Sequence, residues 1–337
     1  MRRSRTLAQL QEDRLNRALA LRREGRLDEA VILLESLLVD QPANPLALAH
    51  LAHCQLRRGQ PQVALAELGK AEAAGGATSF TARVRGDALY RLARYGPARD
   101  AYREADALGD RTAWPLAQLA RSCLRLRDIE GARGAAARAV EREPGAAAAW
   151  VVLGDVSARA GDVAGAEAAF ARAHEIDAGD GYAYARLIES RLLQLEPEQR
   201  RREVELLLRS TGRDNRFLLQ VLARLQGQLG DQAAAASAWR SSRQGGDNLY
   251  AQKMEGYALR RAGQLDQAAA LMHACLLRDP EDVILFRTYV RMQRERGALD
   301  ELRRALSELL PVAGSRRGAV MGELRKLGEG APEPSPR

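Results

Sequence analysis

The sequence predicts an all-α solenoid, in which short antiparallel helix pairs stack one on the next. Hydrophobic residues make up 46% of the 337 residues but aromatic residues only 4%, a composition typical of helices built from Ala and Leu. A small residue also recurs every 34 residues through five consecutive units, as Ala18, Ala52, Gly86, Ala120 and Gly154. A second position keeps the same register, as Ala30, Ala64, Ala98, Ala132 and Ala166. Length alone suggests about two globular domains, but a period of this size indicates one array of stacked repeats.

The unit from Ala147 to Asp180 shows most clearly why each repeat should form two helices. Its first half places Trp150, Leu153 and Ser157 on one stripe of a helix, and its second half does the same with Ala166, Phe170 and Ala173. Gly154 and Ala166 are small where the two helices would cross, which lets the backbones approach closely. Between the helices, Gly161 can adopt the positive φ that ends one helix, and Asp162 can cap the next.

These offsets match the tetratricopeptide repeat (TPR) pattern W-x2-L-G-x2-Y…A-x3-F…P, and the chain resembles TPR proteins from Gln11 to about Arg316. The resemblance implies a right-handed superhelical solenoid of about nine antiparallel helix pairs, whose first helices line a concave face. It indicates the fold specifically, whereas it says little about the ligand.

The predicted boundaries follow from the period. Residues 1–10 extend the first helix, residues 11–316 form nine TPR-like repeats, residues 317–327 form a capping helix, and residues 328–337 form a disordered tail. The sixth repeat is divergent, because Pro197 opens its second helix and no small residue follows at the expected position. The repeats begin at residues 11, 45, 79, 113, 147, 181, 216, 249 and 283.

The chain carries none of the common catalytic or nucleotide-binding motifs, so we expect no enzymatic activity and no cofactor. His50 and His53 could share one helix face beside Cys54, but no second ligand cluster follows, which favours ordinary helix residues over a metal site. The three cysteines, Cys54, Cys123 and Cys275, are odd in number and indicate a reducing compartment. We find no signal peptide and no membrane span, and we expect a cytoplasmic protein that does not bind membranes.

Basic residues number 52 against 44 acidic residues, which gives a net charge of +8 and a pI near 9.8. All but three of the basic residues are arginine. Two explanations fit this usage. One is planar, bidentate recognition of anions, and the other is a GC-rich bacterial genome whose codons favour Arg, Ala and Gly.

In TPR proteins the second, fifth, ninth, twelfth and thirteenth positions of each repeat face the groove, and this resemblance selects a basic set. The thirteenth position forms an arginine ladder, namely Arg23, Arg57, Arg91, Arg125, Arg159 and Arg261. The other positions add Arg22, Arg83, Arg121, Arg224, Lys253, Arg260, Arg287, Arg291 and Arg294. Five acids occupy the same positions, so the predicted groove carries about +10 while the whole chain carries +8. A simpler explanation of the ladder is that a cation in the last turn of a helix interacts favourably with the helix dipole, which stabilises the helix by ~0.3–1 kcal/mol.

Aromatic residues are concentrated at the second position of the repeats, which holds five of the 15 in the chain: Phe80, Trp114, Tyr182, Phe217 and Tyr250. Each ring could pack against the preceding repeat, or it could contact a ligand in the groove. The sequence leaves both interpretations open.

Together these features predict a non-catalytic protein–protein interaction scaffold or adaptor. Its basic, aromatic-containing groove would bind a peptide segment of a partner that carries acidic and apolar residues. An alternative is RNA or another polyanion in the same groove, and another is an interaction module of a multi-protein enzyme or assembly complex. Some TPR proteins clamp chaperone C-termini with groove asparagines and lysines in successive first helices. Asn16, Asn44, Asn215 and Asn248 do not occupy those positions here, so that ligand is not expected.

Overall fold

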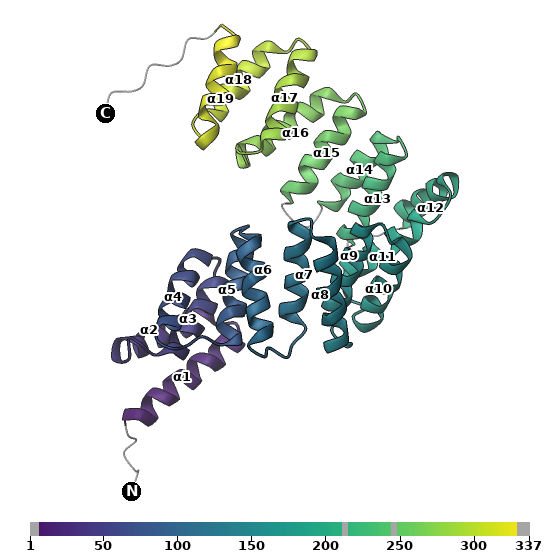
Figure 1. The fold of residues 1–337 in the computed structure, drawn as a ribbon. Helices are drawn as coiled ribbons and strands as arrows, with labels where there is room; N and C mark the ends of the chain where they lie inside the picture. The colour runs from purple at the N-terminus through teal and green to yellow at the C-terminus, as the bar shows by residue number, and fades with distance from the viewer. Residues whose placement is uncertain (1–6, 211–214, 244–247, 329–337) are drawn as a thin grey trace, which may run out of the picture. The chain divides into compact units, whose positions relative to one another are not determined.

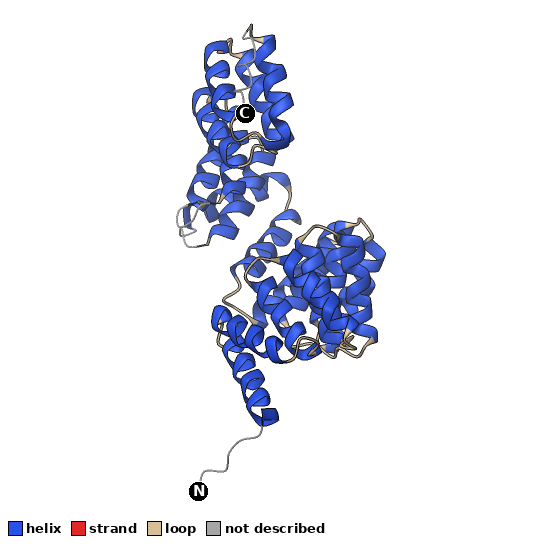
Figure 2. Ribbon diagram, turned by 90° about the vertical axis from the view of Figure 1, so that its left-hand side faces the viewer, coloured by secondary structure: helices blue, strands red, loops and turns tan. Residues whose placement is uncertain are grey.

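The computed structural model describes residues 7–210, 215–243 and 248–328, and the regular secondary structure in these ranges is entirely helical (Figures 1 and 2). Successive helices run antiparallel and pair side by side, and the chain's helical part ends in an additional short helix (Figure 1). The predicted all-α fold of stacked helix pairs is therefore confirmed. The tail predicted at residues 328–337 lies, apart from Gly328, outside the described residues, as do residues 1–6.

Contacts between helices divide the chain into two compact units, Met1–Gly179 and Asp180–Arg337. The first unit contains five helix pairs among its described residues. They are α1 (Leu7–Arg23) with α2 (Leu27–Asp40), α3 (Pro45–Arg57) with α4 (Pro61–Ala73), α5 (Ser79–Arg91) with α6 (Tyr95–Ala107), α7 (Trp114–Arg125) with α8 (Ile129–Arg142), and α9 (Ala147–Ala160) with α10 (Val163–Ile176).

The second unit contains four pairs and a terminal helix in the part of the chain that is described. The pairs are α11 (Gly181–Leu193) with α12 (Pro197–Ser210), α13 (Arg216–Gln228) with α14 (Gln232–Ser242), α15 (Leu249–Arg261) with α16 (Leu265–Arg278), and α17 (Val283–Glu295) with α18 (Leu299–Leu309). A short 3₁₀ turn, η1 (Gly314–Arg316), leads into α19 (Arg317–Lys326). Val320 and Leu324 of α19 join the buried cluster that includes Leu306 and Leu309 of α18, so α19 covers the end of that stack.

The turn inside each pair depends on one backbone conformation. Gly161 ends α9 with φ +83°, in the left-handed region that L residues rarely adopt. The same turn position holds glycine with positive φ in most other pairs: Gly25, Gly59, Gly230, Gly263 and Gly297. In the third and fourth pairs the position holds Ala93 (φ 56°) and Arg127 (φ 63°), which adopt the left-handed conformation without being glycine.

The crossing of the two helices in a pair is fitted residue against residue. A Cβ on Gly154 would lie 2.6 Å from the ring of Phe170, and a Cβ on Gly86 would lie 2.6 Å from the ring of Tyr102. Where the first helix has alanine instead, the facing side chain is smaller, as in the pairs Ala18 with Leu34, Ala52 with Leu68 and Ala120 with Ala136. Glycine on the first helix therefore makes room for a large ring on the second.

The divergent sixth pair is the loosest of the described pairs. Val204 is the single buried residue of α12. The helix is also held by Arg200, whose guanidinium donates to the backbone carbonyls of Leu192, at 2.9 Å, and Leu195, at 2.9 Å. Polar contacts at the exposed end of α11 thus replace part of the apolar contact that other second helices make.

Candidate functional site

A groove of about 850 Å³ lies on the first helices of the second unit. Its walls come from the three consecutive first helices α13, α15 and α17, and α14 contributes part of the floor. The resemblance assigned this side of the repeats to the ligand. Six of the residues selected from the sequence line the groove: Arg224, Tyr250, Lys253, Arg260, Arg261 and Arg291.

The floor of the groove is apolar. Trp239 of α14 is 6% exposed, and Tyr250 packs edge-on against it with the ring centroids 5.8 Å apart. Tyr250 is nevertheless 55% exposed, and Ile284 at the mouth of the groove is 71% exposed. Met254 and Tyr257 are half-buried between them. Tyr250 and Ile284 therefore add exposed apolar surface to the same groove, where a ligand could cover them.

The cations around this floor are partly neutralised. Lys253 is 14% exposed and donates to Asp279 and Asp282, both at 2.7 Å. Arg224 pairs with Glu189 on α11. Arg260 and Arg291 share one carboxylate, Glu295, each at 3.8 Å.

Arg261 differs from the other cations of the groove in its contacts. Arg261 is exposed and makes no ion pair or hydrogen bond to a described residue. The groove is therefore mildly basic, with arginines at its edge rather than a continuous positive surface.

The remaining selected residues of the second unit lie outside this groove. Tyr182 and Phe217 pack edge-on at 5.8 Å, and Arg216 lies 4.8 Å above the Phe217 ring. Arg287 is exposed on α17, and Arg294 pairs with Glu323 of α19 at 2.6 Å. These aromatics contact a neighbouring repeat while remaining partly exposed.

In the first unit the arginine ladder is exposed at the last turn of each first helix. Arg91 donates to the backbone carbonyl of Leu56, in the last turn of the preceding first helix, and Arg125 lies 4.7 Å above the ring of Tyr95. Arg23, Arg57 and Arg159 make no ion pair or hydrogen bond within the described residues. The Arg91 contact meets a carbonyl at a helix C-terminus, as the helix-dipole explanation expects. The guanidiniums of Arg23, Arg57 and Arg159 remain available to a ligand.

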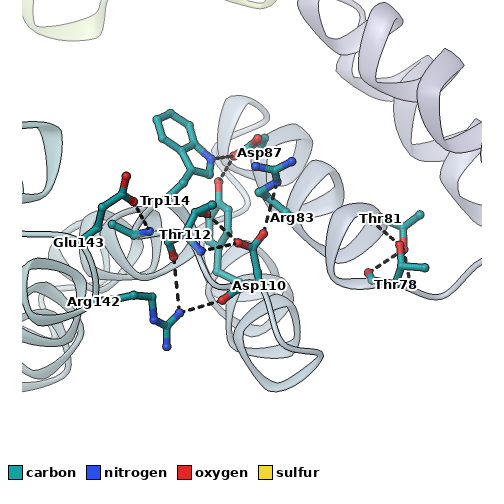
Figure 3. A network of polar contacts seen from close by, with 11 residues as sticks. Thr78, Thr81, Arg83, Asp87, Asp110, Thr112, Trp114, Arg142 and Glu143 are labelled. Carbon is teal, nitrogen blue, oxygen red and sulfur yellow. Dashed lines mark hydrogen bonds and ion pairs between the residues drawn. The ribbon is translucent and has the colours of Figure 1, made fainter. Parts of the chain in front are cut away.

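Trp114 is held by a polar network that also fixes the neighbouring arginine (Figure 3). Its indole donates to Asp87 at 3.3 Å, and the buried Tyr102 hydroxyl donates to the same oxygen at 2.8 Å. Burial raises the pKa of Asp87, and these two donors oppose the rise. Arg83 lies 3.6 Å from Asp110, whose carboxylate also accepts from Thr112 (Figure 3). Trp114 thus packs against the preceding repeat and is still 41% exposed.

Arg121 lies beside the same network. Burial raises the pKa of Tyr102, Asp87 adds to the rise, and the charge of Arg121 opposes it. Arg121 is half-buried on α7 and makes no ion pair to a described residue.

The densest group of selected residues in the first unit surrounds Phe80. The centroid of its ring lies 4.9 Å from that of His50 and 5.8 Å from that of His53, and both histidines are on α3. The guanidinium of Arg22 lies 5.8 Å from the ring centroid and that of Arg83 lies 5.4 Å from it. We call these five residues the Phe80 cluster.

Sequence reasoning selected Phe80, Arg22 and Arg83 but treated the two histidines as ordinary helix residues. A usable signal was present. His50 and His53 are three residues apart, so they lie on one face of α3. The ring at the second position of the next repeat packs against that face.

Acids outside the groove positions change the charge that the repeat positions indicate. Asp110, Asp279, Asp282 and Glu323 do not occupy groove positions of the repeat, yet each pairs with a selected cation. The predicted +10 counted charges by repeat position alone, so it overstates the free positive charge on these faces.

The described residues were compared with what a metal site or a reactive thiol requires. No group of three or more His, Cys, Asp or Glu side chains is placed there to hold a metal ion. The three cysteines are free and buried, and burial raises the pKa of each thiol. Among the described helices, none combines the length and the apolar character needed to cross a bilayer.

Comparison with known proteins agrees with the fold. Residues 15–80 and 118–181 match the family model of the tetratricopeptide repeat, while a search of curated proteins found no match. A tetratricopeptide repeat protein from Parabacteroides merdae is similar over 74% of this chain and 98% of its own, with 15% identity and a TM-score of 0.58. The pilF protein of Pseudomonas aeruginosa (16% identity, 69% of this chain and 90% of its own, TM-score 0.48) is also similar. So is a thermophilic TPR protein from Thermus thermophilus (23% identity, 54% and 99%, TM-score 0.46). Residues 15–80 and 118–181 therefore carry tetratricopeptide repeats, and the other described residues continue the same all-α architecture of paired helices.

Proposed function

We propose that this protein is a non-catalytic interaction scaffold that binds a peptide segment of a partner protein in the groove of α13, α15 and α17. The segment combines apolar anchors with acidic residues. The observation that carries the proposal is one groove that combines the exposed side chains of Tyr250 and Ile284 and the half-buried Met254 with unpaired or loosely paired arginines.

The size of the groove suits such a ligand. Binding pockets for small molecules and side chains are typically ~300–1,000 Å³, predominantly apolar, with a few polar groups that orient the ligand. A groove of about 850 Å³ fits two or three anchor side chains of one peptide. Helical grooves of this kind receive either an extended segment or an amphipathic helix.

The energies favour apolar anchors over charge as the main source of affinity. A micromolar complex requires about −8 kcal/mol, and an exposed ion pair contributes roughly 0.2–1 kcal/mol. Burying one large apolar side chain contributes about 1.5–3 kcal/mol. Arg261, Arg260 and Arg291 therefore supply orientation and partner choice, while the floor around Met254 supplies most of the binding free energy.

The same charges argue against RNA in this groove. A nucleic acid needs a row of free cations along its backbone, and here Lys253 and Arg224 are already paired with carboxylates. The exposed ring of Tyr250 could stack on a base, so RNA stays the second candidate in the experiment.

The test is selection of 12-residue peptides from a displayed library on the full chain, followed by affinity measurement. We expect selected peptides to carry acidic residues next to aromatic or aliphatic ones. Met254→Arg, which places a charge on the apolar floor, should weaken them by more than tenfold. Arg261→Glu should mainly slow association and reduce its salt dependence.

Leu206→Ala is the matched control, because Leu206 is 57% exposed on α12 and is not among the residues that line the groove. Its affinity for the selected peptides should equal that of the wild type. If Met254→Arg binds the peptides as tightly as the wild type does, the groove is not the binding site. If single-stranded RNA binds and Met254→Arg abolishes it while no peptide is selected, the ligand is RNA and the proposal is wrong.

A further inference from the structure

The Phe80 cluster carries more positive charge than the acids around it balance. Arg22 comes from α1, His50 and His53 from α3, and Phe80 and Arg83 from α5, so three successive first helices converge on one ring. Arg23 and Arg57 lie close enough to act on the same groups, since their charges lower the pKa of Arg22 and of the histidines. Asp110, 3.6 Å from Arg83, is the acid paired with the cluster among the described residues.

Two polar atoms in the cluster have no hydrogen-bond partner among the described residues. They are Nε of Arg22 and Nδ1 of His50, and both are buried. A buried polar group without a partner costs about 1–3 kcal/mol. Nη1 of Arg22 contacts Nδ1 of His53 at 3.4 Å, which assigns the neutral imidazole as the acceptor of that contact. The guanidinium therefore still has donors to offer.

We propose that the Phe80 cluster binds a phosphate group. The guanidiniums of Arg22 and Arg83 both lie against the Phe80 ring, and each presents a planar fork of N–H donors that suits the oxygens of a tetrahedral dianion. A single carboxylate would satisfy one fork and leave the other charges opposed to each other. The phosphate group is either free in solution or carried on a phosphorylated side chain, and the experiment separates these two sources.

The histidines give the site a second property. The charges that act on them are those of Arg22 and Arg23 from α1, Arg57 on their own helix, and Arg83 from α5. Burial, followed by the charges of the neighbouring arginines, lowers the pKa of His50 and of His53 to about 4. A bound dianion offsets the arginine charges and raises both histidine pKa values, so binding takes up protons and strengthens as the pH falls.

The experiment is calorimetric titration of the full chain with inorganic phosphate in a low-chloride buffer at pH 7. We expect saturable binding to one site, weakened at least tenfold in Arg22→Gln/Arg83→Gln. Arg159→Gln is the matched control, because Arg159 is an exposed ladder arginine of the same unit that makes no contact with Phe80. Circular dichroism verifies that each variant is folded, and Arg22→Lys, which keeps the charge but loses the fork, should show intermediate affinity.

Two further arms define the ligand. A phosphoserine peptide that binds at least tenfold tighter than inorganic phosphate identifies a phosphorylated partner as the source, and the reverse order identifies free phosphate. Sulfate keeps its charge between pH 5 and 7, so its affinity should rise as the pH falls, and His50→Asn/His53→Asn should flatten that rise. The proposal is overturned if phosphate gives no saturable binding, or if the double arginine variant binds it as well as the wild type does.

Discussion

Gly154 and Phe170 meet across the crossing of α9 and α10 with no space for a methyl group between them. We expect Gly154→Ala to destabilise the protein by roughly 1–3 kcal/mol, because the new Cβ forces the ring or the helix to shift. Urea unfolding measures the change. In an ordinary exposed helix the same substitution would stabilise.

The chain offers a control and a rescue for this prediction. Gly134 lies inside α8 with open space around its Cα, so Gly134→Ala should raise stability by about 0.5–1 kcal/mol. Adding Phe170→Leu to Gly154→Ala recreates the Ala with Leu combination of the first two pairs and should recover part of the loss. Equal effects of Gly154→Ala and Gly134→Ala would show that the crossing is not close-packed.

Ala93 and Arg127 hold the left-handed turn conformation that glycine provides in most other pairs. Because that conformation costs an L residue about 1–2 kcal/mol, Ala93→Gly and Arg127→Gly should each raise the melting temperature. Gly59→Ala, at the equivalent turn with φ +81°, should lower it. A melting temperature unchanged in all three variants would contradict the role of this turn.

His50 and His53 predict a pH dependence of stability. Each pKa is about 4 in the folded protein, below the ordinary value of 6.5, so the stability linked to neutral histidine is complete above pH 6.5 and is lost as the pH falls through 4. Between these limits the unfolded chain binds up to two more protons than the folded one. Urea unfolding from pH 7 to 4.5, in a buffer without polyvalent anions, should show a steeper loss in the wild type than in His50→Asn/His53→Asn. Parallel curves would mean that the histidines titrate normally.

At the scale of the element, α12 differs from the other second helices. It buries Val204 alone and relies on Arg200 contacts to carbonyls at the end of α11. A helix with so little buried apolar surface opens at a low free energy. Hydrogen exchange should therefore show residues 197–210 exchanging well before residues 163–176 of α10, which bury Ala166, Ala169, Phe170 and Ala173. Arg200→Ala should speed the exchange of α12 further, and equal protection of the two helices would contradict this account.

At the scale of the whole molecule, helices that pack together are one or two elements apart along the chain. Stability in such a structure is a sum of repeat and interface terms, so unfolding need not be a single cooperative step. We expect tryptophan fluorescence and far-ultraviolet circular dichroism to follow different urea midpoints. Single-tryptophan variants that retain Trp114 or Trp239 would assign the transitions to the first or second unit. Coincident curves from all probes would indicate one cooperative molecule instead.

The sequence by itself determined the helix pairs, because their signals are local. Stripes at helical spacing, the small residue at each crossing and the turn glycine all act within a few residues, or within one repeat of 34. The repeat register also indicates which aromatic residues occupy the second position and which arginines lie in the last turn of a first helix. Whether these side chains contact a ligand stays a prediction.

Only the tertiary structure decided which charges remain free and which side chains meet. Lys253 reaches Asp279 across 26 residues of sequence, Arg83 reaches Asp110 across 27, and Arg22 reaches His53 across 31. The repeat pattern specifies positions on one helix but not the partner that a long side chain finds on the next. Stacking brings these groups together, and because electrostatic energy depends on distance in space, the free charge of a groove cannot be read from sequence positions alone.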